Sequence, residues 1–190
     1  MLVEFPFFGA GINYFPKEIS ALKVFEPRYL LLVADCIIEN KSFIVGRSLE
    51  KIDHVVSEVK IIDYQDISNA EQFLIVECIN IFKIKFINQN FSYPICGVEE
   101  YYQVGLPPEI HQLEELELNI FKMINNLIDK GFNIELPIFE VKNENRIDKL
   151  WELCRKTPVN IEIKDILISE NDLMERYNFL SKYVNNILNI

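Results

Sequence analysis

The segment 15–29, FPKEISALKVFEPRY, followed directly by the apolar run LLLVADCII, decides how this chain begins to fold. The alternation over residues 19–24 predicts a β-strand. Pro27 has no N–H to donate and a preset φ, so it suits the first turn of a helix. We therefore expect a strand that passes, at the proline, into a helix over residues 28–39. The apolar stripe of this helix is expected at Leu30, Val33, Ala34 and Ile37.

The rest of the chain up to residue 106 has the pattern of a small β-barrel. Residues 42–45, 54–64 and 73–87 are short or long runs rich in β-branched and aromatic side chains, and short polar turns separate them. Strands of uneven length joined in this way, with one early helix, predict a closed or nearly closed barrel.

The apolar pattern changes after Gly-Leu-Pro-Pro at 105–108. Beyond it the period is 3.6 residues, and helices are expected over 113–127, before Gly131, and over 146–155. The segment 132–141 contains a proline and is expected to be irregular. The sequence thus predicts two parts, residues 1–106 as a barrel and residues 107–190 as a helical subdomain. A last helix is expected to start from a Ser169 cap and to bury Leu173, Tyr177, Leu180, Val184 and Ile187.

Composition restricts the classes of function. Hydrophobic residues make up 49% of the 190-residue chain, so we expect a globular protein with a sizeable core. The net charge of −10 is shared by both parts, which argues against a nucleic-acid partner and favours basic, apolar polypeptide segments. No apolar run reaches the roughly 18 residues of a membrane span, and the N-terminal residues, without a basic stretch before an apolar one, are not expected to form a signal peptide. Buried reduced thiols, and hence a cytoplasmic location, are expected from the four widely spaced cysteines, Cys36, Cys78, Cys96 and Cys154.

Catalytic signatures are missing from the sequence. There is no phosphate-binding loop, and His54 and His111 each lack a neighbour at metal-ligand spacing. We therefore expect no enzyme activity, no cofactor and no metal. Lys83 and Lys85 alternate with aromatic residues, as in a nucleic-acid-binding strand, but the alternation places the rings on the other face, toward the core.

Several motifs together resemble the N-terminal, substrate-binding domain of Lon proteases. They are the broken strand Phe5-Pro6-Phe7, the step Phe15-Pro16, the string Phe25-Glu26-Pro27-Arg28-Tyr29, the pair Tyr93-Pro94 and the closing helix at 167–188. The resemblance implies an α+β fold, namely a PUA-like β-barrel with one early helix followed by a helical C-terminal subdomain. It also implies a stand-alone domain without the ATPase and protease domains of Lon, which recognises unfolded or exposed polypeptide segments and could act with a separate protease.

Two groups of residues are candidates for such recognition. Phe25, Glu26, Arg28 and Tyr29 carry the family motif, although Glu26 and Arg28 could instead hold the strand–helix junction. Exposed aromatic residues near loops could frame a groove between the barrel and the helices. They are drawn from Tyr14, Phe15, Phe91, Tyr93, Tyr101, Tyr102, Phe132, Phe139 and Trp151, with Tyr101, Tyr102, Phe132 and Phe139 as the preferred candidates. A small-molecule-binding module, an RNA-binding module of PUA-like fold and a hydrolase remain the alternatives.

Overall fold

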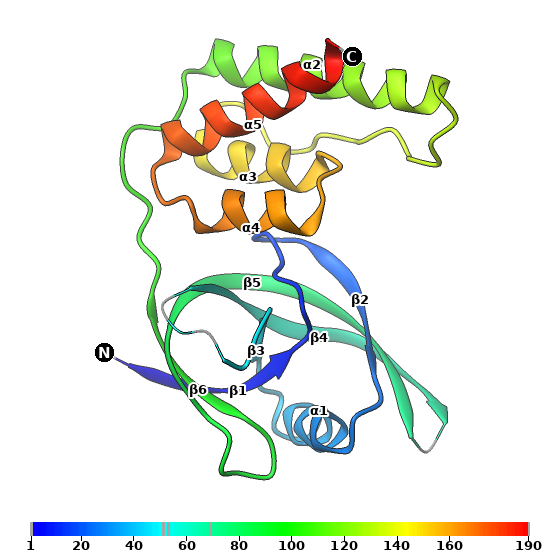
Figure 1. Cartoon of the computed structure of the whole chain (residues 1–190), viewed down its shortest axis with the longest axis vertical. Helices are drawn as coiled ribbons and strands as arrows, with labels where there is room; N and C mark the ends of the chain where they lie inside the picture. Colours follow the sequence, from blue (N-terminus) through cyan, green and yellow to red (C-terminus); the bar gives the residue numbers. More distant parts are fainter. Residues whose placement is uncertain (1, 51, 53, 69, 190) are drawn as a thin grey trace. The chain divides into compact units, whose positions relative to one another are not determined.

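The computed structural model describes residues 2–50, 52, 54–68 and 70–189, and the chain divides into two compact units, residues 1–101 and 102–190 (Figure 1). The sequence placed this boundary between residues 106 and 107. Each unit has its own core, and each is described here by itself.

In its described part, unit 1 is a six-stranded sheet that closes on itself. The strand order is β2-β5-β4-β3-β1-β6, and β5 pairs with β6 as well, which completes a ring of five strands with β2 added outside it. Only β1 and β3 pair in parallel. The predicted barrel with one early helix is confirmed. Its elements are β1 (Val3–Gly9), β2 (Ile19–Val24), α1 (Pro27–Glu39), β3 (Phe43–Gly46), β4 (Val55–Ser68), β5 (Glu71–Asn88) and β6 (Ile95–Glu100).

The two rings of β5 that were expected to face the core differ in their surroundings. Phe82 is partly buried and packs against Phe5, with ring centroids 5.7 Å apart. Phe86 is 36% exposed, so the prediction for this ring is wrong. The pairing register shifts between Ile84 and Phe86, which turns Phe86 outward over Gly97. One cluster of fully buried core residues consists of Phe7, Ile44, Val56, Ile84, Cys96 and Val98.

Helix α1 starts with Pro27 at its first position, as expected, and ends at Asn40, which has a left-handed φ of 50°. Its buried face is rotated relative to the prediction. Tyr29 sets this rotation, because its ring lies 4.1 Å from that of Phe8 and its hydroxyl accepts a hydrogen bond from the Gly9 N–H (3.2 Å). Of the predicted stripe only Val33 is fully buried. The buried residues of α1 are Tyr29, Leu32, Val33 and Cys36.

Unit 2 contains the helices α2 (Ile110–Asp129), α3 (Arg146–Lys156), α4 (Ile161–Ser169) and α5 (Leu173–Leu188). The predicted stripe of α2 is buried from Leu113 to Ile124. Gly131 follows α2 with a φ of +90°, and the N–H groups of Gly131 and Phe132 bond back to the carbonyls of Ile128 (2.8 Å) and Leu127 (3.0 Å). Gly131 therefore ends the helix as expected, because glycine adopts this backbone conformation without strain.

The start of α5 differs from the prediction. Ser169 is the last residue of α4 rather than a cap. The apolar residues before it form this helix, which starts after Asn160, whose side chain accepts a hydrogen bond from the Ile163 N–H (2.9 Å). Asp172 caps α5 instead, and its carboxylate accepts from the N–H groups of Met174 (2.9 Å) and Glu175 (3.1 Å). The predicted irregular segment before α3 has no regular secondary structure over residues 132–140.

Candidate functional site

A cleft of about 830 Å³ lies in unit 1, beside α1. Figure 1 shows the connection between β5 and β6 next to this helix, and the start of β1 supplies the remaining wall. Three segments that are distant in the sequence thus meet here. The cleft is lined by Glu4, Phe5, Pro6, Leu31, Asp35, Cys36, Glu39, Asn40, Lys41, Ser42, Phe91, Ser92, Tyr93 and Ile95.

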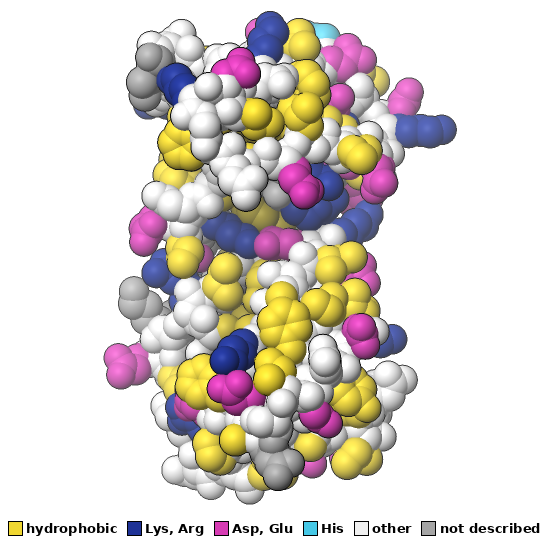
Figure 2. Space-filling model, turned by 90° about the vertical axis from the view of Figure 1, so that its right-hand side faces the viewer, with side chains coloured by type: hydrophobic (Ala, Val, Ile, Leu, Met, Phe, Trp, Pro, Cys, Tyr) yellow, Lys and Arg dark blue, Asp and Glu magenta, His cyan; other side chains and the backbone are white. Residues whose placement is uncertain are grey.

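The apolar part of the cleft is open to solvent. Leu31, on α1, is 44% exposed, and Phe91, in the β5–β6 connection, is 62% exposed. Phe5, Pro6 and Ile95 add further apolar surface. Large exposed hydrophobic side chains occur elsewhere on both units as well, among acidic and basic ones (Figure 2). What sets Leu31 and Phe91 apart is that two different elements bring them into one concave surface, which is the usual shape of a binding site.

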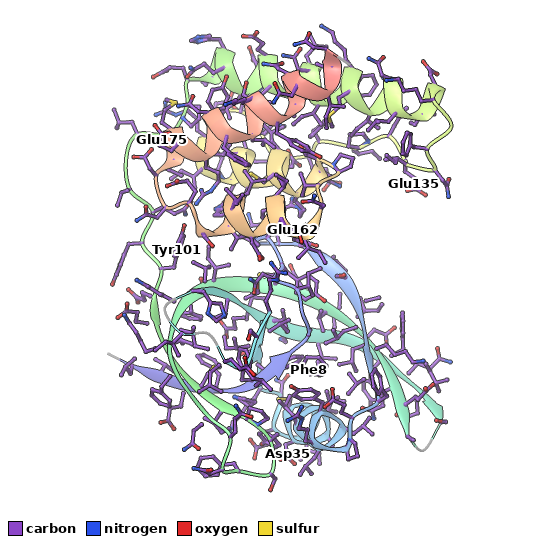
Figure 3. The ribbon with its side chains drawn as sticks, in the orientation of Figure 1. Phe8, Asp35, Tyr101, Glu135, Glu162 and Glu175 are labelled. Atoms are coloured by element: carbon purple, nitrogen blue, oxygen red, sulfur yellow. The ribbon has the colours of Figure 1, made fainter. Side chains whose placement is uncertain are left out.

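The polar part of the cleft is acidic. Its charged residues are Glu4, Asp35, Glu39 and Lys41, and Lys41 already forms an ion pair with Glu39 (2.5 Å). Asp35 projects from α1 (Figure 3) and accepts a hydrogen bond from the Tyr93 hydroxyl (3.0 Å). Among the residues that the structure describes, no cation lies within ion-pair distance of Glu4 or Asp35.

Two weak acids in the cleft are held in their neutral forms. Burial raises the pKa of the Cys36 thiol to about 11, and the charges of Asp35 and Glu39 add to this shift. Burial also raises the pKa of the Tyr93 phenol to about 12, helped by its hydrogen bond to Asp35. Neither group is therefore an activated nucleophile at neutral pH. All four cysteines are buried and free of disulfides, as the sequence predicted.

The family-motif residues lie at the start of α1 and outside the lining of the cleft. Phe25 is 60% exposed, whereas Tyr29 is buried. Arg28 pairs with Glu26 (2.8 Å) at the surface and lies 4.8 Å from the centre of the Tyr29 ring. Glu26 and Arg28 thus contact each other and the strand–helix junction.

The four preferred aromatic candidates are divided between the units. Tyr101 ends unit 1 and is half-buried, and Tyr102 begins unit 2 and is 70% exposed. Phe132 is 56% exposed just after α2, and Phe139 packs under the Lys149 ammonium, 5.0 Å from the ring centre. None of the four lines the cleft. The groove between the two parts stays a prediction.

The sequence reasoning missed Leu31, Asp35 and Glu4 as site residues, although it included Phe91 and Tyr93 among the aromatic candidates. One signal was available for Leu31. A run of three leucines in a helix of amphipathic period cannot be buried completely, so at least one must lie outside the buried face. The rotation of α1 decides which one.

Other kinds of site can be assessed over residues 2–189, apart from the three internal positions not described. Over that part of the chain, no three His, Cys, Asp or Glu side chains are grouped to hold a metal ion. His54 immediately precedes β4, and His111 is exposed near the start of α2. Over the same residues, no helix combines the length and the apolar character needed to cross a membrane.

Comparisons with known proteins agree with this architecture. Two solved structures resemble the chain over nearly its whole length. One is a Lon N-terminal domain protein from Xanthomonas campestris, with TM-score 0.70, 21% identity and coverage of 95% of this chain and 98% of that one. The other is the N-terminal domain of Lon protease from the Mycobacterium avium complex, with TM-score 0.71, 13% identity and coverage of 97% and 99%.

The predicted α+β, PUA-like fold is thereby confirmed. No curated protein sequence matches the chain. The family model of the ATP-dependent protease La (LON) substrate-binding domain matches residues 8–186. The match covers most of the 190 residues, and it agrees with the resemblance of the motifs around Pro16 and Pro27. The chain therefore belongs to the LON substrate-binding domain family.

Proposed function

We propose that this chain recognises polypeptide substrates and holds an exposed apolar segment in the cleft beside α1. The observation that carries this proposal is the meeting of Leu31 and Phe91, both largely exposed, in one concave surface of about 830 Å³. Exposed apolar groups in a cleft gain free energy when an apolar ligand removes them from water. Membership of a substrate-binding domain family supports the same role.

The openness of this surface favours a chain-like ligand over an enclosed small molecule. Small-molecule sites are usually enclosed enough to bury most of their ligand, whereas two walls of this cleft, Leu31 and Phe91, are 44% and 62% exposed in the free chain. An extended segment of an unfolded protein can lie along such a surface and insert single side chains. The three carboxylates in the lining disfavour a phosphate backbone, which argues against RNA as the ligand here.

We propose that the role is binding without catalysis. Cys36 and Tyr93 are protonated at neutral pH, and hydrolysis would need an activated nucleophile. We propose that the chain acts in the cytoplasm as an adaptor or regulator of proteolysis, presenting bound segments to a separate protease. The buried, reduced thiols are compatible with that compartment.

The test is a binding titration with a fluorescein-labelled, extended peptide rich in Phe and Leu, followed by fluorescence anisotropy. Leu31→Ala and Phe91→Ala should each weaken binding by roughly tenfold, because each removes apolar contact worth about 1–2 kcal/mol. Both side chains are exposed, so thermal stability should stay nearly unchanged.

The matched control is Ile67→Ala. Ile67 is 52% exposed on β4, in the same unit, and it does not line the cleft. Its truncation should leave the peptide affinity within about twofold of the original value. Equal losses for all three variants, or no peptide binding by the unchanged chain, would refute the proposal.

A further inference from the structure

We infer that the cleft selects polypeptide segments in which a Lys or Arg side chain stands close to a large apolar one. This inference rests on the proposed function and adds the chemistry of the ligand. The apolar side chain would contact Leu31 and Phe91, and the cationic group would lie near Glu4 and Asp35. Its basis is the distribution of charge around the cleft.

The lining of the cleft carries more negative than positive charge. Three carboxylates, Glu4, Asp35 and Glu39, face one ammonium group, that of Lys41, so the formal balance is −3 + 1 = −2. Lys41 is already paired with Glu39. Among the described residues, no lysine or arginine forms an ion pair with Glu4 or Asp35.

The end of α1 adds to the negative potential. The helix ends at Asn40, which lines the cleft, and no basic side chain occurs in its last turn. The carbonyl groups at a helix C-terminus carry a partial negative charge, which attracts cations. Burial is the main cause of the raised pKa of Cys36, and the charges of Asp35 and Glu39, which belong to this same wall, add to the shift.

A second cleft lies at the same end of α1. This smaller cleft, of about 220 Å³, shares Cys36, Asn40 and Lys41 with the first and reaches β4 between Lys60 and Tyr64. An extended segment seated on Leu31 and Phe91 therefore has room to continue along the C-terminal end of the helix. A flexible polypeptide fits such a double cleft better than a compact ion does.

A lysine or arginine is the natural cation for this surface. Each has a long aliphatic stem that can lie on apolar walls such as Leu31 and Phe91 while its charged end reaches a carboxylate. Asp35 is held in place by the Tyr93 hydroxyl, so part of the ordering cost of an ion pair is already met. Because the surface is open, a bound cation would keep part of its hydration.

The experiment uses three labelled peptides with the same Phe- and Leu-rich sequence and two variable positions, filled by Lys, Gln or Glu. At low salt, the Lys peptide should bind about tenfold more tightly than the Glu peptide, with the Gln peptide between them. The difference should shrink as salt is added, because salt screens the charges, while the Gln peptide should change little.

The protein variant for this test combines Glu4→Gln with Asp35→Asn. Both changes keep size and shape, and the amide oxygen at position 35 can still accept the Tyr93 hydrogen bond. The variant should lose most of the preference for Lys over Glu and keep its affinity for the Gln peptide within about twofold. The control combines Glu50→Gln with Asp66→Asn, which remove the same net charge from unit 1 outside the cleft.

The outcomes separate the two proposals. Equal binding of all three peptides, still weakened by Leu31→Ala, would overturn the charge selection and leave the proposed function intact. Loss of the preference in the control variant to the same extent would overturn the assignment to this cleft, because net charge alone would then explain it. No binding of any peptide would refute the proposed function, and the present inference with it.

Discussion

The two units of this chain have interiors of different chemistry. In the described part of unit 1, the buried polar residues are the uncharged Asn13 and Ser57. Unit 2 instead buries three charged side chains almost completely, namely Lys149, Glu152 and Arg176. The difference follows from the backbone. In unit 1 the irregular connection at Tyr14 is bonded by the uncharged Ser57 hydroxyl, whereas in unit 2 charged side chains bond to the backbone of the irregular connections.

Glu152 and Lys149 illustrate this role at the connection between α2 and α3. One oxygen of Glu152 accepts hydrogen bonds from the N–H groups of Glu140 (2.7 Å) and Val141 (3.1 Å). The other pairs with the Lys149 ammonium at 2.9 Å, and Glu117 also pairs with Lys149. The buried pair therefore fastens the irregular segment to α3.

Arg176 has the corresponding role at the other connections of unit 2. Its guanidinium lies 3.7 Å from the centre of the Trp151 ring. It donates hydrogen bonds to the Leu167 carbonyl (2.9 Å), the Gln103 side-chain oxygen (2.8 Å) and the Glu170 carbonyl. One side chain thus joins α3, the end of α4 and the segment that precedes α2.

The substitution with the largest expected effect on stability is Arg176→Met, which removes a buried charge from unit 2. This change leaves three acceptors without their donor, and we expect the free energy of unfolding of unit 2 to fall by about 3–5 kcal/mol. Trp151 is the chain's single tryptophan, so its fluorescence in a urea titration reports on unit 2. The control Arg28→Ala removes an exposed arginine of unit 1, so it should leave the unfolding of unit 2 reported by Trp151 nearly unchanged. A loss from Arg176→Met as small as that of the control would contradict the structural role.

The stability of unit 1 should depend on the packing of its side chains rather than on buried charge. Gly97→Ala tests this. A Cβ atom at position 97 would overlap the Phe86 ring, so the ring must move, at a cost of about 2 kcal/mol. Hydrogen exchange of the β5 and β6 amides should speed up while Trp151 fluorescence is unchanged. Adding Phe86→Ala to Gly97→Ala should remove the clash. If the double variant is no more stable than expected from two independent losses, the ring is not the cause.

Acid should lower the stability of unit 2 through the buried Glu152 carboxyl, by less than either substitution does. Burial alone would raise the pKa of Glu152, but its hydrogen bonds from Glu140, Lys149 and Val141 outweigh burial and bring the pKa below the usual range. A carboxyl with a lowered folded pKa stabilises the fold above its unfolded value of about 4.3, and this contribution is lost as the pH falls through the folded value.

We therefore expect the urea midpoint reported by Trp151 to fall as the pH drops below about 4. The variant Glu152→Gln separates this carboxyl from all others, because it keeps an acceptor oxygen and cannot ionise. Its midpoint should be lower at neutral pH and should fall less steeply in acid. Parallel acid profiles for the two proteins would show that Glu152 does not contribute.

Much of the fold could be predicted from local pattern. The strand that passes into α1 at Pro27, the stripe of α2 and the stop at Gly131 all follow from backbone restrictions or apolar spacing within a few residues. The predictions that were wrong depended on neighbours distant in sequence. The buried face of α1 is set by Tyr29 against Phe8, and the outward turn of Phe86 by its pairing with β6.

The sequence by itself determined most of the elements, the barrel followed by helices, the excess of acidic residues and the surplus of apolar side chains. Only the tertiary structure decided that Glu4, Leu31, Asp35 and Phe91 share one cleft. Their meeting requires β6 to pair with β1 and Tyr93 to bond Asp35 on α1. Spacing along a chain fixes local dihedral preferences, but which side chains become neighbours depends on strand pairing and on helix rotation in the packed state.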